Sequence, residues 1–209
     1  MAIQSLQPGM NYQEALRRLS DPGPLGGLRR WITGPLRGIA EIYLPYRLYK
    51  VAVHDRRFRS VHHCAVDAAA GTLDPYEFAA PPAPGEWMEV ETRNFHPARL
   101  DESQTQKLVK EKVRRLLYSR GFFRVANPNI TAELIQAEFY VPYWAAFYGH
   151  EQNLSLTVLN AVRRTVEGSK ARRLVRAWLL LPFTNSVPFG LEEETQGSSG
   201  SPLRGHPSD

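Results

Sequence analysis

Three consecutive residues, His62, His63 and Cys64, carry the side chains most suited to chemistry in this chain. A cysteine thiolate is a nucleophile, and histidine can activate it or join it in binding zinc. In an extended strand His62 and Cys64 point to the same face, because residues two apart do so. Zinc needs three or four ligands, and the other histidines show no metal-binding spacing. We therefore expect no metal site and interpret Cys64 as a half-buried strand residue.

Carboxylates follow this segment at Asp67, Asp74 and Glu77, so an enzyme would have its site near His62, Cys64 and Asp67. The chain contains no nucleophile elbow, phosphate-binding loop or dinucleotide-binding glycine pattern. An aspartate after a strand also serves its own turn by accepting backbone N–H groups. An enzyme is therefore the weakest of our functional hypotheses, and we predict neither a catalytic residue nor a cofactor.

Two segments, 107–120 and 163–176, concentrate basic side chains in a chain of net charge +5. Basic helices can neutralise phosphate groups, so a nucleic-acid-binding protein is one alternative. The contacts predicted for an anionic partner are Arg114, Arg115, Arg172, Arg173 and Arg176. The same pattern is typical of the solvated face of an amphipathic helix, which is the interpretation that we favour.

A seven-residue segment occurs twice, as AEIYLPY at 40–46 and as AEFYVPY at 137–143. Such a recurrence predicts an internal duplication. Aromatic residues gather in and beside the two copies: Tyr43, Tyr46, Tyr140, Tyr143, Trp144 and Tyr148. We interpret them first as core residues. The sharper hypothesis is that they line a groove that binds a peptide or ligand.

The hydrophobic pattern predicts the elements that position these residues. We expect helices over 11–20, 101–119 and 169–180, with Asp101 or Ser103 capping the second. We expect strands over 39–53, 58–66, 87–92, 134–148 and 154–159, the long strands forming hairpins with their return strands. A lone hairpin needs cover, so we expect a helix over Ile42, Leu44 and Tyr46 and over the equivalent face of the second half. The opposite faces are also apolar, so the halves should meet through them or pair edge to edge.

These elements predict an α+β fold of two related helix-plus-antiparallel-β-hairpin repeats, packed into one compact body. Residues 1–80 would form the first repeat and 101–189 the second. Residues 81–100 would form a proline-rich linker with a short strand. The glycine- and serine-rich residues 190–209 are expected to be a disordered tail.

The first hairpin resembles the PepSY family. The residues that carry the resemblance are 49–53 (YKVAV) and 65–73 (AVDAAAGTL), a strand and then a Val-Asp-Ala-x-x-Gly turn. The second half departs from this pattern, with Asn160 in place of the aspartate and Arg164 in place of Gly71. The resemblance implies a small helix-on-sheet module that binds or regulates other proteins and has no catalytic residues.

Three features favour a cytoplasmic location. The single cysteine excludes an internal disulfide, the start of the chain (residues 1–5) shows no basic region leading into an apolar one, as a secretory signal would, and no stretch predicts a membrane span. Our main prediction is a non-catalytic protein-binding or scaffold module with an unknown protein partner. Nucleic-acid binding through the basic helices is the first alternative, and an enzyme is the second.

Overall fold

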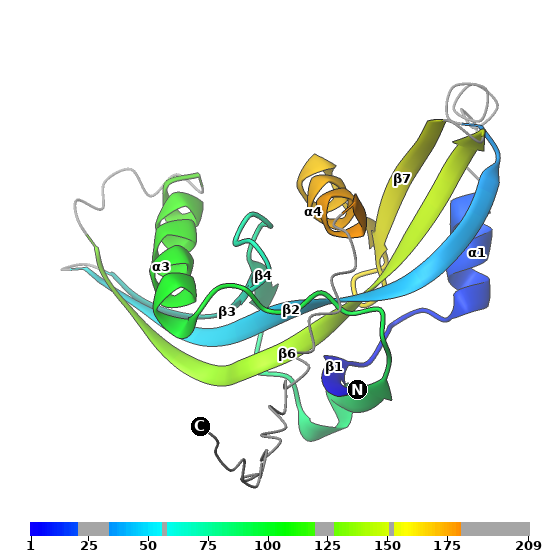
Figure 1. Ribbon diagram of the computed structural model, residues 1–209. Helices are drawn as coiled ribbons and strands as arrows, with labels where there is room; N and C mark the ends of the chain where they lie inside the picture. Colours follow the sequence, from blue (N-terminus) through cyan, green and yellow to red (C-terminus); the bar gives the residue numbers. More distant parts are fainter. Residues whose placement is uncertain (21–33, 56–57, 120–127, 151–152, 181–209) are drawn as a thin grey trace, which may run out of the picture.

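The fold is organised around two long antiparallel strands, β2 (Leu36–Asp55) and β6 (Asn129–His150), which curve across the molecule (Figure 1). The computed structural model describes residues 1–20, 34–55, 58–119, 128–150 and 153–180. In these residues the sheet has the strand order β4-β3-β2-β6-β1-β5, and β7 and then β8 extend it from β6. The remaining strands are β1 (Ala2–Leu6), β3 (Phe58–Asp67), β4 (Tyr76–Phe78), β5 (Trp87–Glu91), β7 (Asn153–Asn160) and β8 (Thr165–Val166).

The described helices are α1 (Tyr12–Ser20), α3 (Glu102–Ser119) and α4 (Ser169–Leu180), with a short 3-10 turn at Pro84–Glu86. The predicted positions of the helices and of most strands are confirmed to within a few residues. Both α1 and α3 begin with a reciprocal cap. The Asp101 carboxylate accepts the Gln104 N–H at 2.8 Å, and the Gln104 side chain accepts the Asp101 N–H at 2.9 Å. Asp101, rather than Ser103, is therefore the cap of α3.

The two copies of the repeated segment pair with each other. In the register of β2 and β6, Leu44 lies opposite Val141, and these two residues occupy equivalent positions in the copies. On either side, Ile42 lies opposite Tyr143 and Tyr46 lies opposite Phe139. Of the two arrangements that the sequence left open, the halves therefore adopt edge-to-edge pairing.

The proline of each copy lies at the point where the hairpin ladder ends. Pairing of β2 with β3 begins at Tyr46, one residue after Pro45, and the Pro45 carbonyl accepts the Ala68 N–H at 2.8 Å. In the same way the Pro142 carbonyl accepts the Ala161 N–H at 3.0 Å, and β6 pairs with β7 from Tyr143 onward. In a strand the nitrogen of a residue lies on the same side as its carbonyl, and here that side is just beyond the end of the β3 or β7 ladder. Among the described residues the missing N–H therefore costs no ladder hydrogen bond.

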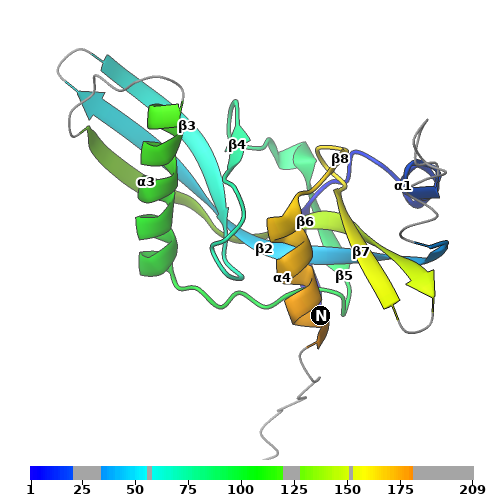
Figure 2. The same ribbon diagram turned by 90° about the horizontal axis from the view of Figure 1, so that it is seen from above.

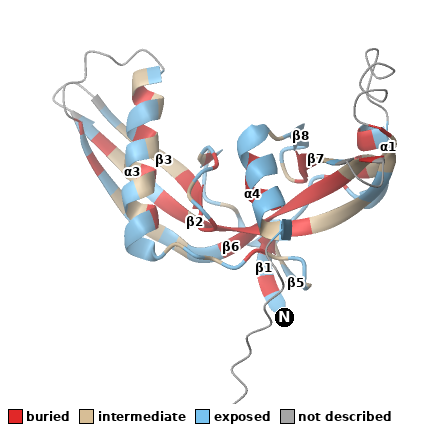
Figure 3. Ribbon diagram, turned by 45° about the horizontal axis from the view of Figure 1, so that its top comes forward, coloured by how far each residue is buried: buried red, intermediate tan, exposed pale blue. Residues whose placement is uncertain are grey.

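Both faces of the central strands are buried where β2 and β6 pair, because consecutive residues are buried there (42–46 and 139–146). Figure 3 shows these stretches in red. One face carries Ile42, Leu44, Tyr46, Phe139, Val141 and Tyr143, and α4 covers it through Ala171, Leu174 and Val175. The other face is covered in three places. There α3 packs on Tyr49, Val51 and Val53, β1 and the segment around Phe95 pack on Tyr43 and Tyr140, and α1 packs on Trp144 and Ala146.

The predicted fold class is wrong. The structure is not two helix-plus-hairpin repeats. It is mostly β, with one strongly curled sheet that contains parallel and antiparallel strand pairs, and the helices pack on this sheet. The helices of the two halves, α1 and α3, were expected on the face that carries Ile42 and its equivalent in the second half, and both pack on the opposite face. The face that carries Ile42 is covered by α4 instead. The prediction failed because each strand has two edges that can pair, and because both faces of these strands are apolar. Local periodicity cannot say which neighbour occupies each edge or face.

Two further predictions concern the division of the chain. The proposed linker, 81–100, contains the 3-10 turn and β5, which pairs with β1 along its whole length. The proposed disordered tail, 190–209, lies outside the described residues. The domain boundaries themselves stay a prediction.

Candidate binding site

A hydrogen bond between two buried tyrosines marks the centre of the candidate site. The hydroxyl oxygens of Tyr46 and Tyr143 are 2.8 Å apart, and the two residues are equivalent in the repeated segment. They are among the largest fully buried side chains of the described residues, at 2% and 1% exposure. The pairing of β2 with β6 places both on the face that α4 covers. Burial raises the pKa of each phenol well above its usual value, so both remain protonated at neutral pH.

A cavity of about 200 Å³ opens above this pair. Its walls come from the segment after β3, from the turn before α4 and from the first turn of α4. The lining residues are Tyr46, Leu73, Asp74, Tyr76, Tyr143, Arg163, Glu167, Gly168, Ser169, Lys170 and Ala171. Figure 2 shows the start of α4 standing over β2 and β6, close to the strands that carry the tyrosines. The cavity is therefore polar at its walls and closed at its base by two neutral phenols.

Two turns shape the walls, and in each the side chain of an aspartate or asparagine accepts backbone N–H groups (an Asx turn). The Asp67 carboxylate accepts three backbone N–H groups, from Ala70, Gly71 and Leu73, at 2.7 to 2.9 Å. In the second half the Asn160 amide oxygen accepts the N–H groups of Val162 and Arg163 at 3.1 and 2.9 Å. In both turns a side-chain oxygen therefore accepts the N–H groups of the residues that follow, even though Asn160 replaces the aspartate.

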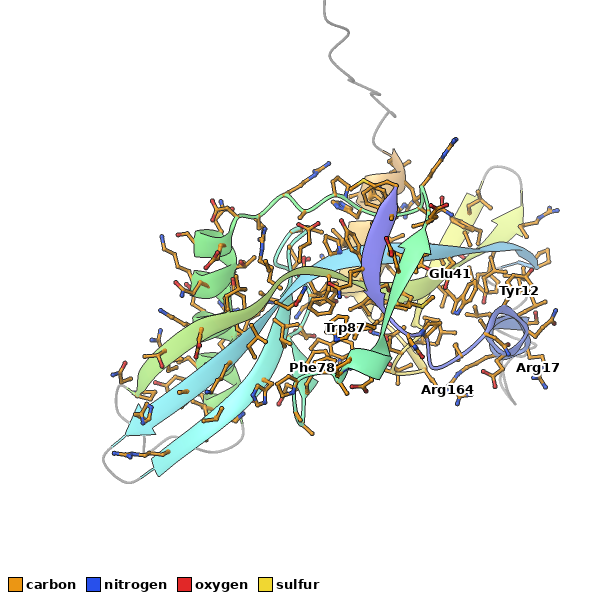
Figure 4. All side chains as sticks on the ribbon, turned by 90° about the horizontal axis from the view of Figure 1, so that it is seen from below. Tyr12, Arg17, Glu41, Phe78, Trp87 and Arg164 are labelled. Carbon is orange, nitrogen blue, oxygen red and sulfur yellow. The ribbon has the colours of Figure 1, made fainter. Side chains whose placement is uncertain are left out.

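The residues that follow these turn centres both have a left-handed backbone. Gly71 has φ of 69° and Arg164 has φ of 59°, so an arginine takes the conformation that favours glycine. The Arg164 guanidinium lies 3.4 Å from Glu14 of α1, and Figure 4 shows it extending toward that helix. The neighbouring Arg163 instead lines the cavity, where its guanidinium carbon lies 3.5 Å from the centre of the Tyr76 ring.

The charged groups of the cavity are partly paired. Lys170 Nζ lies 2.5 Å from Asp74 Oδ1, and both side chains are largely exposed at the mouth. Glu167 Oε1 accepts a hydrogen bond from the Asn160 amide at 3.1 Å. The formal charges of the lining side chains sum to zero, because Arg163 and Lys170 are positive and Asp74 and Glu167 are negative.

The first turn of α4 adds uncompensated backbone donors. The Gly168 carbonyl accepts the Arg172 N–H at 3.3 Å, which makes Gly168 the N-cap residue. Glycine has no side chain with which to cap the N–H groups of Ser169, Lys170 and Ala171. Aligned peptide dipoles give this end of the helix a partial positive charge. The start of α4 thus differs from those of α1 and α3, where side chains accept these bonds.

Of the six aromatic residues predicted to bind, the structure brings Tyr46 and Tyr143 together at the cavity. Tyr43 and Tyr140 pack on the opposite face, where Tyr140 donates a hydrogen bond to Glu138 at 2.9 Å. Trp144 packs against α1, and its Nε1 has no hydrogen-bond partner among the described residues. Tyr148 donates to the Leu19 carbonyl at 2.9 Å. The six side chains therefore occupy three different clusters rather than one groove.

The predicted basic contacts lie on the outer surfaces of two helices. Arg114 and Arg115 are exposed on α3, and Arg172, Arg173 and Arg176 are exposed on α4. The segment 163–168, predicted as part of a basic helix, forms the turn and β8 before α4 begins. Burial lowers the pKa of Lys112 on α3. The charges of Asp67 and Asp74 oppose this effect, and those of Lys170 and Arg115 add to it.

Of the residues considered for chemistry, His62 and Cys64 lie beneath α3, whereas His63 belongs to the opposite face of β3. Cys64 is buried, and the His62 ring nitrogen lies 2.9 Å from the Ser60 hydroxyl. Within the ranges that the structure describes, no group of three or more histidine, cysteine, aspartate or glutamate side chains is placed to hold a metal ion. Asp67, the third residue of this hypothesis, points its carboxylate at its own turn.

Sequence reasoning missed the cavity residues Tyr76, Arg163, Glu167 and Gly168. The repeated Tyr-x-Pro-Tyr segment was the available signal for its base, because it marked Tyr46 and Tyr143. A second signal was the glycine just before α4, in a position where the other helices carry Asn11 and Asp101.

In the described part of the chain, no helix combines the length and apolar character needed to cross a membrane. Comparison of the chain with protein-family models, with curated proteins and with solved structures finds no match, so the resemblance to the PepSY family stays a prediction.

Proposed function

We propose that this chain is a non-catalytic protein-binding module that takes one polar side chain or chain end of its partner into the tyrosine cavity. The observation that supports the proposal is the cavity itself, with a buried phenol pair at its base and polar groups around its mouth. A volume of about 200 Å³ is small for a drug-sized ligand but large enough for one side chain.

The chemistry of the base favours binding over catalysis. A general base works best when its pKa lies near the working pH. Burial moves the pKa of Tyr46 and Tyr143 in the other direction, so both phenols stay neutral. Neutral phenols fixed by packing suit recognition, because they offer hydrogen bonds without a change of charge.

A capture experiment with a blocked cavity tests this function. The full chain, immobilised, is exposed to lysate of the source organism with and without nuclease. The blocking variant is Ser169→Trp, because Ser169 is exposed and lines the mouth. The matched control is Ser119→Trp, at an exposed position at the end of α3.

We expect a set of partner proteins that the wild type and Ser119→Trp retain, that Ser169→Trp loses, and that nuclease does not remove. Retention of the same partners by Ser169→Trp would contradict the proposal. Loss of all partners on nuclease treatment would instead support the basic-helix alternative, in which Arg114, Arg115 and the arginines of α4 contact phosphates.

A further inference from the structure

The structure points to a carboxylate as the group that the tyrosine cavity binds, and we propose that the partner supplies it as an acidic side chain or a free C-terminus. This inference rests on the proposed function and names the chemistry of the same site. Three features of the cavity converge on it: a leftover phenolic proton, uncapped backbone donors and a guanidinium.

The leftover proton comes from counting hydrogen atoms in the phenol pair. Two hydroxyl groups carry two protons, and the bond between Tyr46 and Tyr143 uses one of them. No other hydrogen-bond partner of either hydroxyl occurs among the described residues. A buried donor without an acceptor is costly, so the base of the cavity favours an acceptor atom from outside.

The uncapped donors lie on the wall beside this base. Ser169, Lys170 and Ala171 line the cavity and form the first turn of α4, where N–H groups have no intrahelical acceptor. Gly168 supplies no side-chain acceptor for them. A carboxylate oxygen accepts such hydrogen bonds well and is stabilised by the positive end of the helix.

The cavity contains two cationic side chains, Arg163 and Lys170, and they differ in how readily they can bind an entering anion. The Arg163 guanidinium lies against the Tyr76 ring and carries five N–H donors in a fixed plane, which matches the geometry of a carboxylate. Lys170 is engaged with Asp74, but that pair is exposed at the mouth and exchanges partners at little cost.

Two carboxylates of the chain itself oppose an anion, and both have partners. Asp74 pairs with Lys170, and Glu167 accepts from Asn160. With the formal charges balanced, the helix end and the phenolic proton decide the preference. Both favour an acceptor with negative charge over a cation.

Matched peptides test the inference in the full chain. One pair is an acetylated tripeptide with a free C-terminal carboxylate and its C-terminal amide. The other pair carries a single glutamate or a single glutamine and is amidated in both cases. Binding is followed by NMR shifts of the Ser169, Lys170 and Ala171 amides, with inorganic phosphate as an additional probe.

We expect the carboxylate member of one pair to bind at least about tenfold more tightly than its amide. The pair that shows this difference identifies the source of the carboxylate. Equal binding of both members in both pairs, no binding of any peptide, or tighter binding of phosphate would overturn the inference. If Ser169→Trp still loses the partner proteins in that case, the proposed function survives and only the ligand class is wrong.

Two variants separate recognition from folding. Gly168→Asp places a carboxylate at the start of α4, where a Cβ meets no atom within 4 Å, so it should cap the helix and compete with the ligand. We expect it to lose about tenfold or more in carboxylate affinity without a lower melting temperature. The double variant Tyr46→Phe/Tyr143→Phe should also bind more weakly, whereas Tyr140→Phe, on the opposite face, should not. Unchanged affinity in Gly168→Asp would exclude the helix start as the site.

Discussion

Replacing Gly168 by serine should stabilise the folded protein, because α4 begins at an N-cap that has no side chain. The Gly168 carbonyl accepts the first intrahelical bond, from the Arg172 N–H at 3.3 Å. A Cβ at this position meets no atom within 4 Å, and the backbone is not left-handed, so serine fits without strain. Its hydroxyl can accept the N–H of Lys170 or Ala171.

The magnitude follows from two comparisons. A serine N-cap is typically about 1 kcal/mol more stabilising than an alanine, and a few tenths of a kcal/mol more than a glycine. The comparison with glycine is the net effect of the substitution, because it already includes glycine's greater freedom in the unfolded chain. We therefore expect Gly168→Ser to raise the free energy of unfolding by a few tenths of a kcal/mol, or about 1 °C in Tm for a chain of this size.

The assay is urea and thermal unfolding of three proteins: the wild type, Gly168→Ser and Gly168→Ala. Alanine stiffens the backbone as serine does but offers no acceptor, so it is the matched control. Gly168→Ser should exceed Gly168→Ala by about 1 kcal/mol at equal urea dependence. Equal stability of the two variants, or a serine variant less stable than the wild type, would refute the assignment of Gly168 as the N-cap.

Three other perturbations have expected outcomes. Gly71→Ala should lower the free energy of unfolding by about 1–2 kcal/mol, because φ is 69° there, whereas Gly38→Ala, in open space, should cost less; urea unfolding compares them. Asp67→Ala leaves three backbone N–H groups without their acceptor and should cost about 2–4 kcal/mol by the same assay, and Asp67→Asn should cost less because one oxygen remains; equal costs would contradict this. Burial raises the pKa of Tyr46 and Tyr143 in the folded state, so their contribution is complete below about pH 10 and falls above it, as the unfolded phenols ionise. The double variant Tyr46→Phe/Tyr143→Phe should therefore lose less stability than the wild type between neutral and alkaline pH, and an equal loss would show that the phenols do not contribute.

The sequence determined the local elements of this fold. Apolar residues at helical spacing fixed α3 and α4, and alternation with β-branched and aromatic residues fixed β2 and β6. Asp101 marked the start of α3 because a cap acts on backbone groups only a few residues away. The repeated segment identified Tyr46 and Tyr143 as equivalent, although not as partners.

Only the tertiary structure decided which elements lie together. Each half of the chain contains a helix and a hairpin, and the sequence was consistent with two separate units. Instead β2 and β6 pair through their free edges, and α1 and α3 cover opposite ends of the sheet face that carries Tyr43 and Tyr140. Edge choice depends on contacts between residues far apart in the chain, which periodicity does not encode.

The candidate site depends on the same long-range choice. Tyr46 and Tyr143 share a hydrogen bond across 97 residues of chain, and Arg163 and Gly168 reach them only because α4 packs on their face. The sequence supplied each of these side chains, but their neighbourhood follows from which strand edge and which sheet face were covered. Burial among those neighbours then raises the pKa of both phenols, an effect that depends on packing and not on any local pattern.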